Sequence, residues 1–291
     1  MYKSLAEIIE SANMSGKEFW EVVLEEDIKE RNITFDEGFE QMKAMYLAMK
    51  QADESYDGKL VSASGMVGTD GIKVEKKREK GDSICGDFMM SVMEKAIKMG
   101  ESNACMKRIV AAPTAGSCGV IPAVLISMQE KFGYSEDDVT KSLIIAAGIG
   151  GVIANRAFLA GAAGGCQAEI GSAAAMAAGA AAYLKGADNI AIVNAAAMAL
   201  KNLLGLACDP VGGLVEVPCV KRNTIGAASA LLAADLALAG ISSKIAPDDV
   251  IDAMRNIGVA MPSCIKETGL GGLAVTPSAK SIIETHGKKN G

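Results

Sequence analysis

Aromatic residues are scarce in this chain, and histidine is almost absent. Only 4% of the 291 residues are aromatic and there is one His, although 50% of the residues are hydrophobic. The core must therefore be built from Ala, Val, Ile, Leu, Met and Gly, which let helices pack closely. The single His, His286, lies in a polar C-terminal stretch that we expect to be disordered. Because His is the usual general base near neutral pH, a Lys, a Glu or a group on another chain must serve instead.

The sequence also has no basic block and no long apolar run, and we expect no signal peptide. It carries 29 basic and 35 acidic residues, a net charge of −6, so we predict neither nucleic acid nor an anionic membrane as a partner. The Ala-rich stretch between Glu169 and Lys185 is shorter than the roughly 20 apolar residues that a membrane span needs. The first twenty residues are charged and amphipathic, so we expect a cytoplasmic, reducing location.

Helical periodicity dominates the chain, and we predict a mainly α fold with one catalytic domain over residues 1–291, in which 1–55 form peripheral helices. Two capping boxes, Ser15 to Glu18 and Thr34 to Glu37, predict helix starts. The strand candidates are 59–75, which we interpret as a loop or short strand pair, and 108–112. The other predicted helices are 4–12, 82–99, one beginning near Pro122, 136–147, 151–163, 167–184, 188–204, 224–239 and 247–257.

Three of the seven cysteines lie in unusual stretches of sequence. Cys166 begins an Ala-rich helix, while Cys208 and Cys219 bracket a stretch rich in Pro and Gly that we expect to be irregular through Asn223. Buried cysteines are often packing residues, but irregular backbone and a helix N-terminus favour the thiolate. Closely spaced C-x₂₋₄-C pairs, typical of structural zinc, are absent from the sequence. Three widely spaced thiolates instead favour an iron–sulfur cluster.

Three motifs carry a resemblance to a known family: "AAPTAGSCGVIPAV", "GGCQAEIGSAAAMAAGA" and "LACDPVGGLVEVPCVKRN". The chain resembles the catalytic part of the bacterial iron–sulfur-dependent L-serine dehydratases, and more narrowly the separate α subunit of the two-subunit type. The resemblance extends over essentially the whole chain. It implies that Cys166, Cys208 and Cys219 hold a [4Fe-4S] cluster in which one iron has no protein ligand.

The resemblance also implies the reaction, conversion of L-serine to pyruvate and ammonia. An iron with an open position acts as a Lewis acid on the substrate hydroxyl. A related group of desulfidases uses the same kind of cluster to act on cysteine, so a desulfidase activity is an alternative. A non-catalytic cluster-binding subunit and a metal-free helical protein are further alternatives.

A Gly-containing loop before the helix near Pro122 is a candidate anion site. Free amides at a helix N-terminus favour a carboxylate, and the hydroxyls of Thr114 and Ser117 add donors around Gly116. We interpret this loop as the cradle for the serine carboxylate, with an ordinary turn and cap as the alternative. Thr114 and Ser117 are therefore candidate catalytic and substrate-binding residues.

Other polar residues near these motifs are further candidates. Asp70 and Lys73 lie in or just after the Gly-rich loop 62–71 and are candidate substrate-binding residues, with a solvated loop as the alternative. Glu169 is a candidate catalytic residue, and Gln167 a supporting or substrate-facing one. A buried carboxylate needs a cation, a donor or a proton, and the candidate cations are Arg156, Lys221 and Arg222.

The remaining expectations concern the other cysteines and the partners. Cys85, Cys105 and Cys118 are expected to be packing residues, and we assign no role to Cys264. In the resembled family a smaller β subunit supplies substrate-binding residues, including a His-bearing loop. We therefore expect a hetero-oligomer with a β subunit that covers the loops near 62–71, and L-serine as the substrate.

Overall fold

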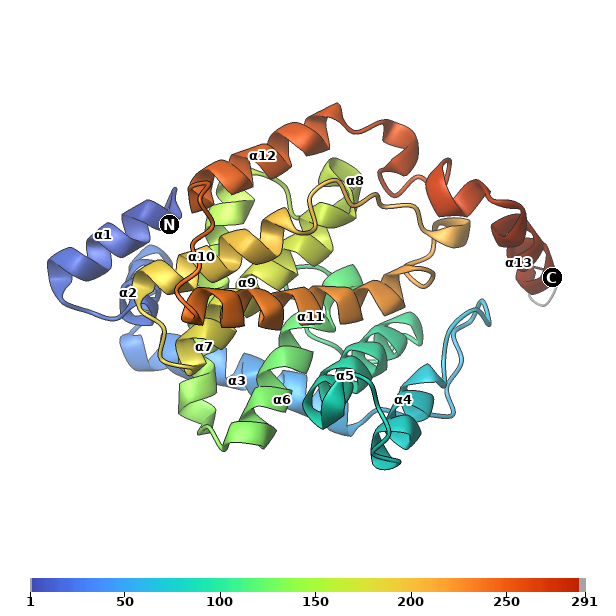
Figure 1. The fold of residues 1–291 in the computed structure, drawn as a ribbon, viewed down its shortest axis with the longest axis horizontal. Helices are drawn as coiled ribbons and strands as arrows, with labels where there is room; N and C mark the ends of the chain where they lie inside the picture. The colour runs from blue at the N-terminus through green and yellow to red at the C-terminus, as the bar shows by residue number, and fades with distance from the viewer. Residues whose placement is uncertain (1, 288–291) are drawn as a thin grey trace.

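The computed structural model describes residues 2–287, and these residues form helices joined by short turns (Figure 1). They contain no β-sheet, only two isolated bridges, Val61 with Gly68 and Cys208 with Lys266. The mainly α fold class is therefore confirmed. The helices are α1 (Leu5–Ser15), α2 (Phe19–Arg31), α3 (Phe35–Glu54), α4 (Asp70–Glu79), α5 (Gly86–Ala104), α6 (Val120–Phe132), α7 (Glu136–Arg156), α8 (Gly161–Gly164), α9 (Ser172–Leu184), α10 (Asn189–Lys201), α11 (Cys219–Leu238), α12 (Pro247–Ala260) and α13 (Pro277–Gly287).

Helix α9 is the centre of the packing. It contacts α6, α7, α10 and α11, and nearly all of its residues are buried (Figure 1). Its Ala and Gly side chains permit this close approach: a Cβ placed on Gly179 would lie 2.3 Å from Cδ1 of Ile149 on α7. The small-residue composition thus explains how one helix can have neighbours on every side. Within residues 2–287, no helix combines the length and hydropathy required to span a membrane.

Of the N-terminal helices, α2 and α3 pack against α7, while α1 packs against α2, α10 and α12, as their amphipathic pattern predicts. The capping box of Thr34 and Glu37 begins α3 and is confirmed. The box predicted at Ser15 is wrong, because Ser15 is the last residue of α1 and the left-handed Gly16 ends that helix. Helix α2 begins instead with a box formed by Glu18 and Glu21.

Two predicted boundaries fail because distant contacts override local signals. Helix α7 runs unbroken through its glycines, where two helices were predicted. A Cβ on Gly148 would meet Val23 of α2 at 2.6 Å, and one on Gly150 would meet Met176 of α9 at 2.7 Å, so the glycines serve packing rather than a break. Helix α4 was missed inside the predicted loop 59–75. The backbone amides of Asp70 and Gly71, in the first turn of α4, donate hydrogen bonds to the carboxylate of Glu101 on α5.

Three further corrections concern the second half of the chain and one strand candidate. Helix α11 begins at Cys219, five residues before the predicted start, so the irregular stretch ends before Asn223. Residues 108–112 form no strand. The stretch expected to be disordered is helical as far as it is described: Glu284 to Gly287 belong to α13, and the last four residues lie outside the described part of the chain.

Candidate functional site

The three singled-out cysteines lie at the ends of elements that meet beside α9. Cys166 precedes one turn of π-helix, Gln167–Gly171, that leads into α9. Cys208 lies on an extended segment whose amide donates to the carbonyl of Ile265, and Cys219 is the first residue of α11. Their exposed fractions are 2%, 2% and 7%. Single π-turns inside helices are frequent at functional sites, and this one directs Cys166 and Glu169 toward the same region.

The three thiols interact electrostatically with one another. Burial raises the pKa of Cys166 to about 11 and that of Cys219 to about 12, and it also raises the pKa of Cys208. Ionisation of Cys166 would raise the pKa of both others, and ionisation of Cys219 would raise that of Cys208. Without a bound metal, burial therefore favours the neutral thiol in all three side chains. A bound metal reverses this preference, because a coordinating thiol is deprotonated.

Arg222 is the cation nearest to the thiols among the predicted candidates. Its guanidinium donates to the carbonyl of Ala207 at 2.7 Å and to Oδ1 of Asp209 at 2.8 Å, and its charge lowers the pKa of Cys166 against the effect of burial. Asp209 is buried and also accepts from the amide of Leu273 at 2.8 Å. Asp209 was missed at the sequence level, although its position directly after Cys208 was a usable signal.

Glu169 accepts a hydrogen bond from a hydroxyl and does not form an ion pair with one of the predicted cations. Oγ1 of Thr114 donates to its Oε1 at 2.7 Å, while its Oε2 lies 4.0 Å from Sγ of Cys208. Burial raises the pKa of Glu169 above its usual value. Arg156 pairs instead with Asp252 at 2.6 Å. The expectation of a cation partner is wrong for Arg156, and the carboxyl group is poised to hold a proton.

Lys221 and Gln167 have structural partners too. Lys221 lies 3.3 Å from Asp70, away from Glu169. Gln167 is fully buried, and its amide donates to the carbonyls of Gly164 and Met254 and accepts from the amide of Gly205 at 2.8 Å. Gln167 therefore fixes the backbone around Cys166, which agrees with the supporting one of its two predicted roles.

The predicted hydroxyl turn exists and is held by a residue that the sequence analysis missed. Oγ of Ser117 lies 3.0 Å from Oγ1 of Thr114, in a capping box around the 3-10 turn Ala115–Ser117. Asn223 of α11 is 1% exposed and donates to the carbonyls of Gly116 and Cys219, both at 3.0 Å. Its Oδ1 accepts from the amide of Gly119 at 2.9 Å. One amide side chain thus ties the turn to the backbone of a thiol residue.

The Gly-rich loop 62–71 is attached to the segment between Cys208 and Cys219. Ser62 donates to Oε2 of the buried Glu216 at 2.9 Å, and Ser64 donates to the same oxygen. Glu216 was another residue missed at the sequence level. Asp70 pairs with Lys73 at 2.7 Å, and Lys73 is highly exposed, so the structure places these two side chains against each other at the surface.

The other cysteines have different surroundings. Cys118 is fully buried, its Sγ lies 3.7 Å from the carbonyl of Met99, and burial raises its pKa to about 12. Cys85 and Cys264 are exposed and Cys105 is partly exposed. Cys118 is thus a packing residue, as predicted, whereas Cys85 is not packed.

The cysteine site offers three buried thiols, the donor type that iron–sulfur clusters take as ligands. Gly161 approaches it so closely that an added Cβ would lie 2.9 Å from Sγ of Cys208 and 2.8 Å from Oε2 of Glu169. Across residues 2–287, the structure brings no three His, Cys, Asp or Glu side chains together in a way suited to one metal ion.

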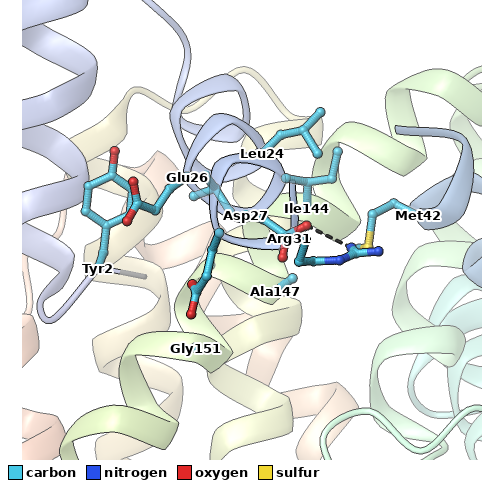
Figure 2. A pocket seen from close by; sticks show the side chains of 12 residues that line it. Tyr2, Leu24, Glu26, Asp27, Arg31, Met42, Ile144, Ala147 and Gly151 are labelled. Atoms are coloured by element: carbon cyan, nitrogen blue, oxygen red, sulfur yellow. Dashed lines mark hydrogen bonds and ion pairs between the residues drawn. The ribbon is translucent and has the colours of Figure 1, made fainter. Parts of the chain in front are cut away.

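A separate cavity of about 160 Å³ lies between α2 and α7, away from the cysteines (Figure 2). Val23, Leu24 and Ile144 supply apolar walls, and acidic side chains lie at its edge. Figure 2 shows the ion pair there between Arg31 and Asp27, whose atoms Nη1 and Oδ2 are 2.9 Å apart. The cavity has none of the thiols or hydroxyls described above in its lining.

Comparison with known proteins finds one matching family model and several relatives of the chain. A family model described as "Serine dehydratase alpha chain" matches residues 14–274. A "Probable L-serine dehydratase, alpha chain" from Bacillus subtilis (strain 168) is 42% identical over 282 residues, 97% of this chain and 94% of that protein. An "L-serine dehydratase, alpha chain" from Peptoniphilus asaccharolyticus is 39% identical over 283 residues, 97% of each. An "L-serine dehydratase" from Mycobacterium tuberculosis (strain CDC 1551 / Oshkosh) is 44% identical over 194 residues, 65% of this chain but 42% of that protein.

Proposed function

The chain belongs to the serine dehydratase alpha chain family, and on that premise we propose that it converts L-serine to pyruvate and ammonia with a [4Fe-4S] cluster. The names of its relatives support the substrate and the class of reaction, a lyase. The observation that supports the cluster is the grouping of three buried thiols, those of Cys166, Cys208 and Cys219. Ionisation of one of them raises the pKa of another.

The cluster would be held by these three thiolates. When bound, it supplies a Lewis-acidic iron that lacks a protein ligand and can bind the serine hydroxyl. Gly161 packs tightly against this site, since any side chain there would collide with the Cys208 thiol and with Glu169. Arg222 offsets the negative charge that thiolates bring to a buried site, and Asp209 holds its guanidinium in place.

The protein's own groups would bind the substrate and handle its protons. The overall reaction removes the α-proton and the β-hydroxyl of serine, and the resulting aminoacrylate takes up water and releases ammonia. The turn of Thr114, Gly116 and Ser117 would orient the carboxylate. Glu169, whose pKa is raised by burial, would hold a proton at Oε2, the oxygen that faces Cys208, while Thr114 keeps Oε1 fixed.

A partner chain completes this proposal. The relatives' name "alpha chain" supports a second chain, and a β subunit would supply the groups that hold the ammonium and remove the α-proton. The isolated alpha chain should therefore bind its cluster but turn over serine slowly or not at all. We propose a hetero-oligomer in the cytoplasm as the working enzyme.

The test is anaerobic mixing of the cluster-loaded chain with a purified β subunit, followed by measurement of pyruvate from L-serine. Activity should rise with β subunit, fall in air, and return with ferrous iron and thiol. In parallel, L-cysteine is supplied and sulfide is measured. Sulfide release without pyruvate from serine would favour the desulfidase, and no turnover of either by the saturated, cluster-loaded mixture would leave a non-catalytic cluster protein. Full activity without β subunit, unchanged in His286→Ala, would contradict the shared site.

A further inference from the structure

Exposed apolar side chains lie on segments that belong to residues 208–219 or that bond and pack against them. We call this group of side chains the rim surface. Between 39% and 72% of each side chain is exposed, and the members are Val61, Leu214, Leu270, Leu273, Val275 and Ile283. Isolated exposed apolar residues are ordinary on protein surfaces, whereas a contiguous group marks an interaction site. The segments that carry them lie together at the right of Figure 1.

Hydrogen bonds and packing make these segments one unit. The 3-10 turns Val211–Gly213 and Gly272–Val275 contact each other, and both contact α13. A Cβ on Gly212 would lie 3.7 Å from Ile283, and Ser62, next to Val61, bonds Glu216. The rim surface therefore packs on the same residues that form the loop between Cys208 and Cys219.

The rim surface is also tied directly to the site. The amide of Cys208 donates to the carbonyl of Ile265 at 2.9 Å, and the amide of Glu267 donates to the carbonyl of Cys208 at 2.7 Å. The amide of Leu273 donates to Asp209, the residue that holds Arg222. A molecule that covers Leu270 and Leu273 would thus rest on the backbone that positions one thiol and the site's cation.

We propose that the rim surface is the docking site of the second, beta-type chain of the enzyme, an inference that rests on the proposed function. The lengths of the relatives indicate this occupant. The match covers 94% to 97% of the two alpha chains, but only 42% of the M. tuberculosis L-serine dehydratase, so more than half of that longer protein lies outside it. The name "alpha chain" implies a second chain, and the unmatched portion of the longer protein indicates what kind of chain that is. A partner that completes the site must dock beside the segments that carry Cys208 and Cys219.

A second apolar surface provides the natural comparison. A groove of about 720 Å³ runs along α11, with Ile225 and Leu232 both more than half exposed beside it. Its lining includes residues of α5, α6 and α9 but none of the thiols, and neither Asp209 nor Glu216. A partner bound in this groove would lie on the outer side of α11 and would not reach the cysteines.

The experiment measures binding of labelled, purified beta chain to the cluster-loaded alpha chain under anaerobic conditions. Leu270→Asp and Leu273→Asp should each weaken binding about tenfold or more, because a buried charge disrupts an apolar interface. Leu232→Asp, in the groove, is the matched control and should bind as the wild type does. Iron content and thermal melting are measured for each variant, so that a folding defect is recognised.

Hydrogen exchange of the wild-type chain tests the same point without a substitution. Beta chain should protect residues 208–218 and 262–275 but leave α11 from Ile225 to Leu238 unchanged. Wild-type binding by both rim variants, or protection confined to α11, would overturn the proposal. Protection of the rim by the alpha chain alone at rising concentration would identify a second copy as the occupant and overturn it as well. Pyruvate is measured in the same mixtures: binding through the rim without pyruvate would contradict the proposed function and leave the docking site standing.

Discussion

The side chains of Thr114 and Glu169 meet although 55 residues separate them in the chain: Oγ1 of Thr114 donates to Oε1 of Glu169 over 2.7 Å. This bond joins the hydroxyl turn before α6 to the π-turn before α9. It fixes a carboxyl group whose other oxygen faces Cys208 at 4.0 Å. The groups proposed to bind substrate and the thiols proposed to hold the cluster are thereby linked through one side chain.

Gly161→Ala should disturb the site more than the fold. The added methyl would lie 2.9 Å from Sγ of Cys208 and 2.8 Å from the carboxylate of Glu169, so one of them must move. We expect iron content to fall to less than about half, with a loss of no more than about 1–3 kcal/mol in unfolding free energy. Gly171→Ala is the control, because its nearest neighbour is the flexible end of Leu200. Full iron binding by Gly161→Ala, measured after anaerobic reconstitution, would contradict the close packing around Cys208.

Asn223 should contribute to both stability and substrate binding. Asn223→Ala leaves two buried carbonyls and one amide without their partner, which should cost about 2 kcal/mol in urea unfolding. Asn223→Asp keeps the acceptor for Gly119 and loses the two donated bonds, and it should raise KM for serine more than it lowers kcat. Exposed Asn202→Ala is the control and should change neither value. Unchanged stability and KM in both Asn223 variants would argue against its link between the turn and α11.

Thiol alkylation should separate the cysteines by burial. Iodoacetamide at pH 7.5 should modify Cys85 and Cys264 quickly, since both are exposed. Cys118 should stay unmodified, because it is fully buried and burial raises its pKa to about 12, far from the thiolate form that reacts. Peptide mass spectrometry reads the sites, and all seven cysteines should react in denaturant. Labelling of Cys118 as fast as Cys264 in the folded chain would refute this placement.

The ion pairs of Asp70 predict a pH dependence of stability. Lys73, and then Lys221, lower the pKa of Asp70 from 3.8, against its partial burial. A lowered pKa in the folded state contributes stability above the unfolded pKa and loses it as the pH falls through the folded pKa. Asp70→Asn should therefore reduce the unfolding free energy at pH 7 by less than about 1 kcal/mol, and the difference should shrink below pH 3.8. Asp235→Asn on the exposed face of α11 serves as the control, and a difference that grows in acid would reverse the predicted sign.

Local signals predicted a good part of the fold. The Thr34 capping box, the Ala-rich helix after Cys166 and the Pro-initiated helix at Pro247 all lie where the sequence indicates, because each depends on neighbours within one or two turns. The convergence of the three thiols was predicted from motifs rather than from periodicity. Their burial and mutual effect on pKa agree with that prediction.

Features that depend on distant partners could not be read from the sequence. The start of α4 is capped by Glu101, 31 residues after Asp70. Asn223 bonds the backbone of Gly116, 107 residues away, and Glu216 bonds Ser62, 154 residues away. Nothing in the local pattern marks these residues, since an Asn inside a helix and a Glu in a loop are ordinary. The partners of Gln167, Met254 and Gly205, also come from other elements, so the sequence alone left its supporting and substrate-facing roles open.

The most direct measurement of the central proposal is iron and acid-labile sulfide in anaerobically reconstituted protein. The wild-type chain should contain about four of each per chain. Cys166→Ser, Cys208→Ser and Cys219→Ser should each lose most of both, while exposed Cys85→Ser should keep them. Full iron and sulfide in Cys208→Ser, or none in the wild type, would contradict a cluster held by these three thiols.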